Sequence, residues 1–132
     1  MISSQLISVI ITSYNSSACL RLVLAALERQ TDRAFEVIIA DDGSNEQELA
    51  SIRQIMASCH FPVQMVWQED QGFRAAKARN RAVVQAVGDY LVFLDGDCIA
   101  RPGFIAQHRA LAEPGYWVPG NRILLSKNFT QG

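Results

Sequence analysis

The chain has 132 residues, of which 49% are hydrophobic and 19% are charged, and its formal net charge is -1. This composition fits one globular domain over residues 1–132 and excludes a disordered chain. The balanced charge argues against binding to nucleic acid, and no apolar run approaches the roughly 20 residues that a transmembrane helix needs.

Short apolar runs alternate with helical patterns along the first half of the chain. Leu6 to Ile11 is an apolar run that predicts a strand buried on both faces, and Phe35 to Ala40 predicts a second one. Between them, Ser17 to Gln30 places apolar residues three and four positions apart, which predicts a helix. Ser44 and Gln47 have the spacing of a capping box, so we expect the next helix to start there.

The middle of the chain continues the alternation. The second predicted helix ends near Ser58, and a third strand follows at Pro62 to Trp67. After a loop at Gln68 to Phe73, the residues Ala75 to Val87 have the pattern of a third helix. Tyr90 to Leu94 is apolar throughout and predicts a fourth strand.

The last part of the chain predicts one more helix and one short strand. Pro102 suits the first turn of a helix that runs to Leu111, and Arg122 to Leu125 is a strand-like stretch. The alternation as a whole predicts an α/β fold, with an open, mainly parallel, Rossmann-like sheet flanked by helices on both faces. Ligands of such sheets bind outside the carboxyl ends of the strands.

Three polar clusters are expected at this edge of the sheet. Thr12 to Asn15 follow the first predicted strand, Asp41 and Asp42 follow the second, and Asp95 and Asp97 follow the fourth. Acidic residues also follow strands because loops are solvated and helices need N-caps. For Asp41 and Asp42 taken alone, a turn-and-cap interpretation therefore stays open.

Asp95-Gly96-Asp97 follows the apolar fourth strand directly. Two carboxylates separated by one glycine repel each other unless a cation lies between them or water surrounds them. Hard oxygen ligands suit Mg²⁺ or Mn²⁺, and the glycine lets the backbone approach a ligand closely. The motif predicts a divalent-metal site, with a solvated loop as the alternative.

Arg79 is the unusual residue of the third predicted helix, because it falls in the middle of an otherwise apolar face. A charge there is costly unless it is paired or reaches a ligand. Its guanidinium either extends over the sheet edge towards a carboxylate or phosphate, or snorkels into solvent at the helix end. Tyr14 also has two interpretations, as a stacking surface for a nucleobase or as a simple turn aromatic.

The cysteines and histidines point to no metal or disulfide framework. Cys19, Cys59 and Cys98 are widely spaced, whereas zinc sites and disulfide scaffolds use closely spaced pairs. His60 and His108 are likewise isolated. We interpret the cysteines as free thiols, which fits the reducing cytoplasm, and the first residues show no signal peptide.

Four segments carry a combined signature, namely Val9 to Asn15, Phe35 to Ser44, Gly72 with Ala78-Arg79-Asn80, and Phe93 to Asp97. In this order and spacing they resemble glycosyltransferase family 2, whose members share the GT-A fold. The resemblance covers essentially the whole chain. Gln68 to Arg74 is also similar to the bacterial chondroitin-polymerase-like and galactosyltransferase-like branch.

The resemblance implies a site for a UDP-sugar donor. Thr12 and Tyr14 lie where the family contacts the base, Asp42 where a carboxylate accepts the uracil N–H, and Arg79 where a basic residue lines the nucleotide site. The other residues that it predicts at the nucleotide sugar are Asn15, Asp41, Gly72, Lys77, Asp95 and Gly96.

The resemblance also implies a metal and an acceptor. Asp95 would face the ribose or the metal, and Asp97 would coordinate the Mn²⁺ or Mg²⁺ that bridges the diphosphate. The sugar would pass, with inversion, to a saccharide or glycolipid acceptor in surface polysaccharide or lipooligosaccharide synthesis. The expected location is the cytoplasm or the inner face of the membrane. Peripheral membrane association of the full enzyme and self-association of this chain would both agree with this expectation.

Two departures from the family pattern matter. Thr12 stands where many members have proline, although other members share Thr-Ser-Tyr-Asn. In the family an acceptor-binding half follows the metal motif, whereas this chain stops at Gly132. We therefore expect the catalytic base beyond Gly132 and expect this chain to be the nucleotide-sugar-binding half.

Three alternatives belong to other functional classes. A dinucleotide-binding Rossmann domain would need glycines after the first strand, where this chain has none between Thr12 and Ser17. A phosphoacceptor module also clusters carboxylates at strand ends, but it needs no nucleotide. A third alternative is a fragment that binds the nucleotide and catalyses nothing on its own.

Overall fold

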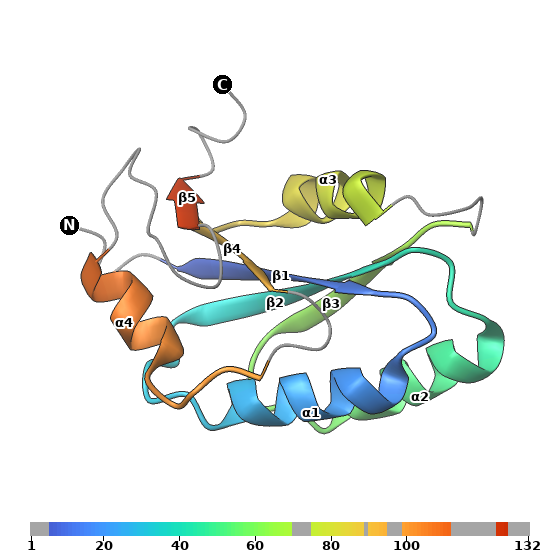
Figure 1. Ribbon diagram of the computed structural model, residues 1–132, viewed down its shortest axis with the longest axis horizontal. Coiled ribbons are helices and arrows are strands. Elements are labelled where there is room, and N and C mark those ends of the chain that lie inside the picture. Colours follow the sequence, from blue (N-terminus) through green and yellow to red (C-terminus); the bar gives the residue numbers. More distant parts are fainter. Residues whose placement is uncertain (1–5, 70–74, 89, 95–98, 112–123, 127–132) are drawn as a thin grey trace.

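A computed structural model describes residues 6–69, 75–88, 90–94, 99–111 and 124–126. Five strands form one sheet in the order β3-β2-β1-β4-β5, with β1 to β4 parallel and β5 antiparallel to β4 (Figure 1). The predicted open, mainly parallel α/β sheet is thus confirmed. The strands are Ile7–Ser13 (β1), Phe35–Asp41 (β2), Val63–Trp67 (β3), Tyr90–Leu94 (β4) and Leu124–Ser126 (β5).

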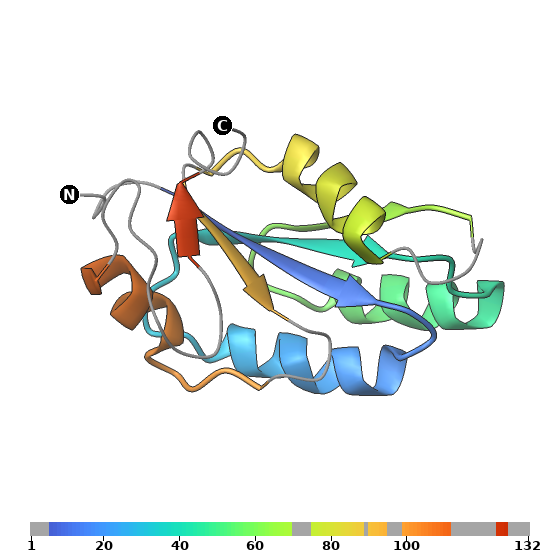
Figure 2. The ribbon, with the colours of Figure 1, turned by 45° about the horizontal axis from the view of Figure 1, so that its top comes forward.

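The described helices cover both faces of the sheet. Helices α1, α2 and α4 pack on one face and α3 on the other, as Figures 1 and 2 show from two directions. No described helix is long and apolar enough to cross a membrane. The helices are Ser17–Glu28 (α1), Glu46–Ala57 (α2), Ala75–Gln85 (α3) and Phe104–Leu111 (α4).

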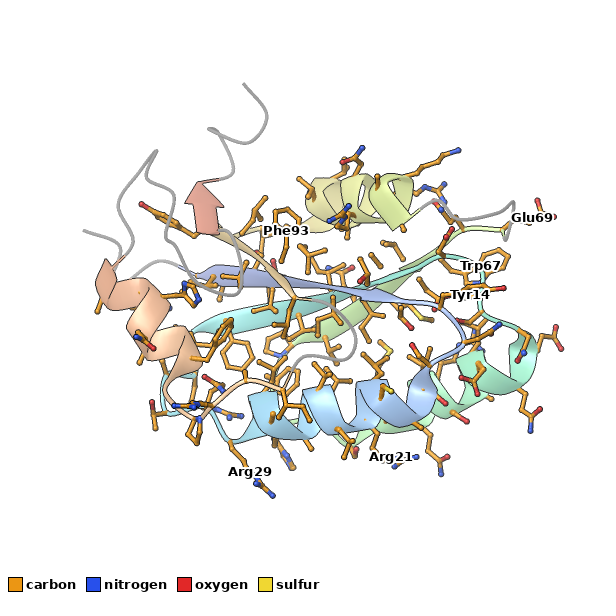
Figure 3. All side chains as sticks on the ribbon, viewed as in Figure 1. Tyr14, Arg21, Arg29, Trp67, Glu69 and Phe93 are labelled. Atoms are coloured by element: carbon orange, nitrogen blue, oxygen red, sulfur yellow. The ribbon has the colours of Figure 1, made fainter. Side chains whose placement is uncertain are left out.

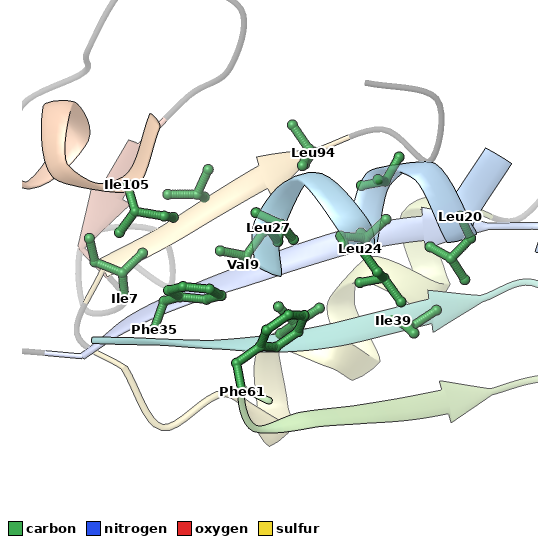
Figure 4. Close-up of a cluster of buried hydrophobic side chains, with 14 of the residues drawn as sticks. Ile7, Val9, Leu20, Leu24, Leu27, Phe35, Ile39, Phe61, Leu94 and Ile105 are labelled. Carbon is green, nitrogen blue, oxygen red and sulfur yellow. The ribbon is translucent and has the colours of Figure 1, made fainter. Parts of the chain in front are cut away.

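The core has two layers because alternate strand residues point to opposite faces of the sheet. Ile7, Val9 and Ile11 point towards α1 and α2, where they join the larger cluster drawn in Figure 4. Ile10 points towards α3 and joins the smaller one. Fully burying each such side chain contributes about 1.5–3 kcal/mol. Burial on both faces therefore explains the nearly continuous apolar runs of β1 and β2. The residues of α3 in the smaller cluster are Ala78, Ala82 and Ala86.

Helix α4 is joined to the end of α1 by Gln30, which is 3% exposed. Its Nε2 donates to the Arg101 carbonyl at 2.7 Å, and its Oε1 accepts the Ile105 N–H at 2.9 Å. Arg109 Nε donates to Asp32 Oδ2 at 2.6 Å. These contacts fix α4 beside the amino ends of the strands.

A second set of hydrogen bonds at this amino edge joins β1, β2 and the end of α3. Ser8 Oγ donates to Glu36 Oε2 at 2.6 Å and accepts the Gly88 N–H at 2.9 Å, and the Val87 N–H donates to Glu36 Oε2 at 2.8 Å. A Cβ at Gly88 would lie 2.5 Å from Ser8 Oγ and 2.6 Å from the Leu6 carbonyl oxygen, so only glycine fits. We call Ser8, Glu36, Val87 and Gly88 the amino-edge node.

The predicted capping box of Ser44 and Gln47 is wrong. The N-cap of α2 is Asn45, whose side chain accepts the Glu48 N–H at 2.9 Å. Ser44 lies one residue earlier and bonds to Asp41 instead, because its hydroxyl is buried beneath the loop.

Pro102 also lies outside the helix that it was expected to open. Helix α4 begins at Phe104, whose N–H donates to the Arg101 carbonyl at 2.9 Å and so closes a turn before the helix. The first strand ends later than predicted, since Thr12 and Ser13 belong to β1 and pair with Ala40 and Asp41 of β2. Polar residues that were expected after the strands therefore lie at their last positions.

Candidate functional site

The carboxyl ends of three neighbouring strands lie level with one another. Ser13 pairs with Asp41, and Asp41 pairs with Trp67, so β1, β2 and β3 end at one line across the sheet. Figure 3 shows Tyr14 and Trp67 at this end of the molecule, above the start of α2. The polar residues of the β1–α1 and β2–α2 loops are thus brought together, as the sequence predicts.

The fourth strand ends at the same edge. Leu94, the last residue of β4, pairs with Ile11 of β1. Asp95, Gly96 and Asp97 follow directly and lie outside the described residues, as does Gly72. Among the described residues no group of three or more His, Cys, Asp or Glu could hold a metal ion. The metal site at Asp95 and Asp97 therefore stays a prediction.

Asp42 forms a buried pair with a residue that the sequence did not single out. Gln68 Nε2 donates to Asp42 Oδ1 at 2.6 Å; Gln68 is 6% exposed and Asp42 is 4% exposed. The Asp42 N–H donates to the Ser13 carbonyl at 2.9 Å, and the Gln68 N–H donates to the Asp41 carbonyl at 3.2 Å. These backbone bonds hold a carboxylate and an amide side by side at the strand ends. The signal available for Gln68 was its place directly after β3.

Asp41, by contrast, uses its carboxylate inside the β2–α2 loop. It is fully buried, with Oδ1 accepting the Ser44 hydroxyl at 2.6 Å. Oδ2 accepts the N–H groups of Ser44 at 2.7 Å and Gly43 at 3.2 Å. A carboxylate that accepts backbone N–H groups after a strand is a turn device. The turn interpretation accounts for these bonds, and a nucleotide contact of Asp41 stays a prediction.

Ser44 connects this loop to the neighbouring strands. Its Oγ accepts the Asn15 N–H at 2.8 Å, and its carbonyl accepts Trp67 Nε1–H at 3.3 Å. We call Asn15, Asp41, Ser44 and Trp67 the carboxyl-edge node. Its members lie in or directly after β1, β2 and β3, so pattern reasoning within one segment could not find it.

Tyr14 stands exposed beside this node. Its side chain is 49% exposed at the end of β1, where an aromatic ring can stack on a flat ligand. Asn15 has a φ of 46°, a left-handed conformation that asparagine tolerates better than most residues. Asn15 Oδ1 also accepts the Asn45 N–H at 3.0 Å, so the turn that carries Tyr14 is joined to the start of α2.

Helix α3 brings positive charge to the same edge. It begins at the carboxyl end of the sheet (Figure 1) and contains Lys77, Arg79 and Arg81 with no acidic residue. Lys77 and Arg81 are exposed, and Arg81 Nη1 donates to the Trp67 carbonyl at 3.1 Å. Arg79 is half-buried, as the helical wheel predicts, and forms no hydrogen bond or ion pair with another described residue. Both interpretations of Arg79 stay open.

A cavity in the described part of the chain lies away from this edge. It is about 340 Å³ in volume and lies between the outer sides of α1 and α2, with Arg21, Glu28 and Cys59 among its lining residues. Burial, and secondly the charge of Glu28, raise the pKa of the Cys59 thiol. Cys19 and Cys59 are free, as predicted, whereas Cys98 lies outside the described residues.

Comparison with protein families gives a match to the family described as Glycosyl transferase family 2, over residues 8–121. Validoxylamine A glucosyltransferase of Streptomyces hygroscopicus subsp. jinggangensis is 37% identical over 102 residues, which are 76% of this chain and 24% of that protein. Hyaluronan synthase of Pasteurella multocida is 38% identical over 108 residues, which are 81% of this chain and 11% of that protein. This chain thus spans a quarter or less of these relatives.

Solved structures agree in fold. The mannosyltransferase PcManGT from Pyrobaculum calidifontis, in complex with GDP-Man and Mn²⁺, superimposes with a TM-score of 0.71 and 25% identity, covering 86% of this chain and 34% of that one. TarS 1–349 of S. aureus, in complex with UDP-GlcNAc, gives a TM-score of 0.66 and 28% identity, covering 79% of this chain and 30% of that one.

Proposed function

Because this chain belongs to glycosyltransferase family 2, we propose that it forms the donor-binding half of a glycosyltransferase that uses a UDP-sugar. The observation that carries the proposal is the buried pair of Asp42 and Gln68, held 2.6 Å apart at the strand ends beside the exposed ring of Tyr14. A ring that stacks and a polar pair that forms hydrogen bonds are the two elements needed to hold a base. TarS and PcManGT, which share this fold, were solved with UDP-GlcNAc and GDP-Man.

The predicted residues then take the following roles on the donor, and a contact of Asp41 with the nucleotide stays a prediction. Tyr14 stacks on the base, with Thr12 beside it, and Asp42 accepts the uracil N–H. Arg79, which is half-buried on α3, extends towards the diphosphate, where a guanidinium fork matches phosphate oxygens. Lys77 is exposed on the same helix and adds positive charge near the phosphates. Asn15, Gly72 and Gly96 complete the proposed set.

We assign the divalent ion, Mn²⁺ or Mg²⁺, to Asp95 and Asp97. Two carboxylates after β4 supply the hard oxygen ligands that these ions prefer, and the bound ion would neutralise charge on the leaving diphosphate. Asp41 and Asp42 are bonded to Ser44 and Gln68, so they are not needed as metal ligands.

The proposed reaction transfers the sugar to a hydroxyl group of a saccharide or glycolipid. The acceptor oxygen bonds to the anomeric carbon as the bond from that carbon to the diphosphate breaks, with inversion. A carboxylate base takes the hydroxyl proton, and Arg79 stabilises the departing diphosphate. We place the base beyond Gly132, in an acceptor-binding half. The family membership removes the dinucleotide and phosphoacceptor alternatives.

The wider setting is also a proposal. Hyaluronan synthase and an amylovoran biosynthesis glycosyltransferase are among the relatives, 38% and 37% identical to this chain. These names support a role in polysaccharide synthesis. Surface polysaccharide or lipooligosaccharide as the product, and the cytoplasmic side of the membrane as the location, are proposed from the family resemblance.

Calorimetric titration with UDP, GDP and ADP, each with and without Mn²⁺, tests the proposal. We expect binding that is selective for UDP and dependent on the metal, and we expect Asp97→Ala to abolish it. Binding that is unchanged in Asp97→Ala would remove the metal role from Asp97. A folded chain that binds none of the three nucleotides would contradict the proposed function. Transfer to an acceptor, compared with donor hydrolysis alone, separates an enzyme from a fragment that only binds.

A further inference from the structure

We propose that Ser44 is a positioning residue for the donor. Through its hydroxyl and carbonyl groups it fixes the turn that carries Tyr14 relative to Asp42, and buried Asp41 acts through it. This inference rests on the proposed function, because it concerns how the same site holds the nucleotide.

Every polar group of Ser44 is used within the carboxyl-edge node. Its N–H and Oγ–H donate to the two carboxylate oxygens of Asp41 at 2.7 and 2.6 Å. Its Oγ accepts the Asn15 N–H at 2.8 Å, and its carbonyl accepts the indole N–H of Trp67 at 3.3 Å. Ser44 is 2% exposed, and all of its polar groups are bonded within the node, so we assign it no contact with the nucleotide. One buried serine therefore links residues at the ends of three strands.

The backbone on both sides of Tyr14 is bonded to the β2–α2 loop. Before Tyr14, the Ser13 carbonyl accepts the Asp42 N–H at 2.9 Å. After it, the Asn15 N–H donates to Ser44 Oγ at 2.8 Å, and Asn15 is in the left-handed conformation, with a φ of 46°. The backbone that carries Tyr14 is thus held on both sides to the loop that carries Asp42.

This arrangement has a direct consequence for binding. A base is held only when the ring and the carboxylate meet it together, which requires both groups to lie within about 0.5 Å of the productive geometry. Removal of the Ser44 hydroxyl leaves the Asn15 N–H and one Asp41 oxygen without their partner. The turn would then be free to move, although no atom that contacts the nucleotide has been removed.

The chain supplies a matched control for this substitution. Ser8 is also buried, donates to a carboxylate at 2.6 Å and accepts a backbone N–H at 2.9 Å, but it lies at the opposite edge of the sheet. We expect Ser44→Ala and Ser8→Ala to lower the denaturation midpoint similarly. We expect the Kd for UDP to rise about tenfold in Ser44→Ala, which equals about 1.4 kcal/mol, and to stay within about twofold of wild type in Ser8→Ala.

A spectroscopic measurement reports the positioning without any nucleotide. In the free chain, the amide resonance of Asn15 and the indole N–H resonance of Trp67 should shift in Ser44→Ala and stay in place in Ser8→Ala. Trp67→Phe is a second variant that keeps the fold, since Trp67 is 45% exposed. It removes one bond to Ser44, and we expect the Kd for UDP to rise about threefold.

The outcomes separate the two proposals. UDP binding by wild type and equal binding by Ser44→Ala would overturn the positioning role and leave the proposed function in place. An equal rise of the Kd for UDP in Ser44→Ala and Ser8→Ala would also overturn the positioning role, because lower stability alone would then explain the weaker binding. If Ser44→Ala fails to fold, an unchanged Kd in Trp67→Phe overturns the positioning role. No UDP binding by the folded wild-type chain would overturn the proposed function, and the positioning role with it.

Discussion

The amino-edge node and the carboxyl-edge node are the same hydrogen-bonding device at opposite ends of one sheet. In each, a buried serine donates to a carboxylate at 2.6 Å and accepts a backbone N–H from a segment distant in sequence. The amino-edge node holds the segment that follows α3 against β1 and β2. The carboxyl-edge node holds the turns between strands and helices, where α/β sheets bind ligands. The two nodes therefore form the same hydrogen bonds but differ in function. Only the node at the carboxyl ends of the strands lies where it can affect ligand binding.

The largest expected effect in this comparison is a loss of stability at the amino edge. Gly88→Ala places a Cβ 2.5 Å from Ser8 Oγ and 2.6 Å from the Leu6 carbonyl oxygen, and neither atom can move freely. We expect the free energy of unfolding, measured with urea, to fall by about 3 kcal/mol. The affinity of the folded fraction for UDP should not change.

Gly103→Ala is the control for that substitution, because a Cβ at Gly103 meets no atom within 4 Å. It should change the free energy of unfolding by less than about 0.5 kcal/mol. Equal stability of the two glycine variants would contradict the close packing of the amino-edge node.

A smaller effect, on binding, is expected at the carboxyl edge. Gln68→Ala removes the amide that donates to Asp42 at 2.6 Å. Without this bond the carboxylate loses its fixed orientation, and we expect the Kd for UDP to rise about fivefold, or about 1 kcal/mol. Gln64→Ala, at an exposed position of β3, should leave the Kd unchanged. Equal Kd values for the two glutamine variants would break the link between the buried pair and binding.

The smallest effect concerns pH and belongs to the amino edge. Burial raises the pKa of Asp32, but hydrogen bonds from Arg109 and the Ala34 N–H outweigh burial, so the pKa lies below its ordinary value of 3.8. The ion pair therefore stabilises the fold fully above pH 3.8 and is lost as the pH falls through the lowered pKa. We expect this ion pair to contribute at most about 1 kcal/mol to the free energy of unfolding.

The measurement is the free energy of unfolding of wild type and Asp32→Asn between pH 7 and pH 2. The two curves should be separated at neutral pH and should converge in acid. A constant separation over the whole range would show that Asp32 stabilises α4 through its shape and not through its charge.

The sheet could be predicted from the sequence because its signal is local. The apolar runs of β1, β2 and β4 follow from burial on both faces. The sequence placed each of the four parallel strands, β1 to β4, within two residues of its bounds. Arg79 was found in the same way, since helical spacing alone places it among alanines that the structure shows to be buried.

The hydrogen bonds of the site could not be predicted in this way. The bond between Ser44 and Asn15, and that between Gln68 and Asp42, join residues more than 20 positions apart, and no periodic pattern encodes them. The predicted N-cap of α2 was wrong for another reason. Ser44 and Asn45 are adjacent and both suit an N-cap, and only burial of the Ser44 hydroxyl against Asp41 decides between them.

The place of β1 at the centre of the sheet has a consequence for the order of folding. Ile7 pairs with Phe35 on one side and with Tyr90 on the other, so the second pairing closes a much longer loop. The loop-closure entropy and the contact order are both larger for the pairing of β1 with β4, so this pairing is expected to be the slower one. The half built from β1, β2 and β3 is therefore expected to form first, with Asp42 and Gln68 already in it. β4, which directly precedes the predicted metal motif in the sequence, is expected to join this half afterwards.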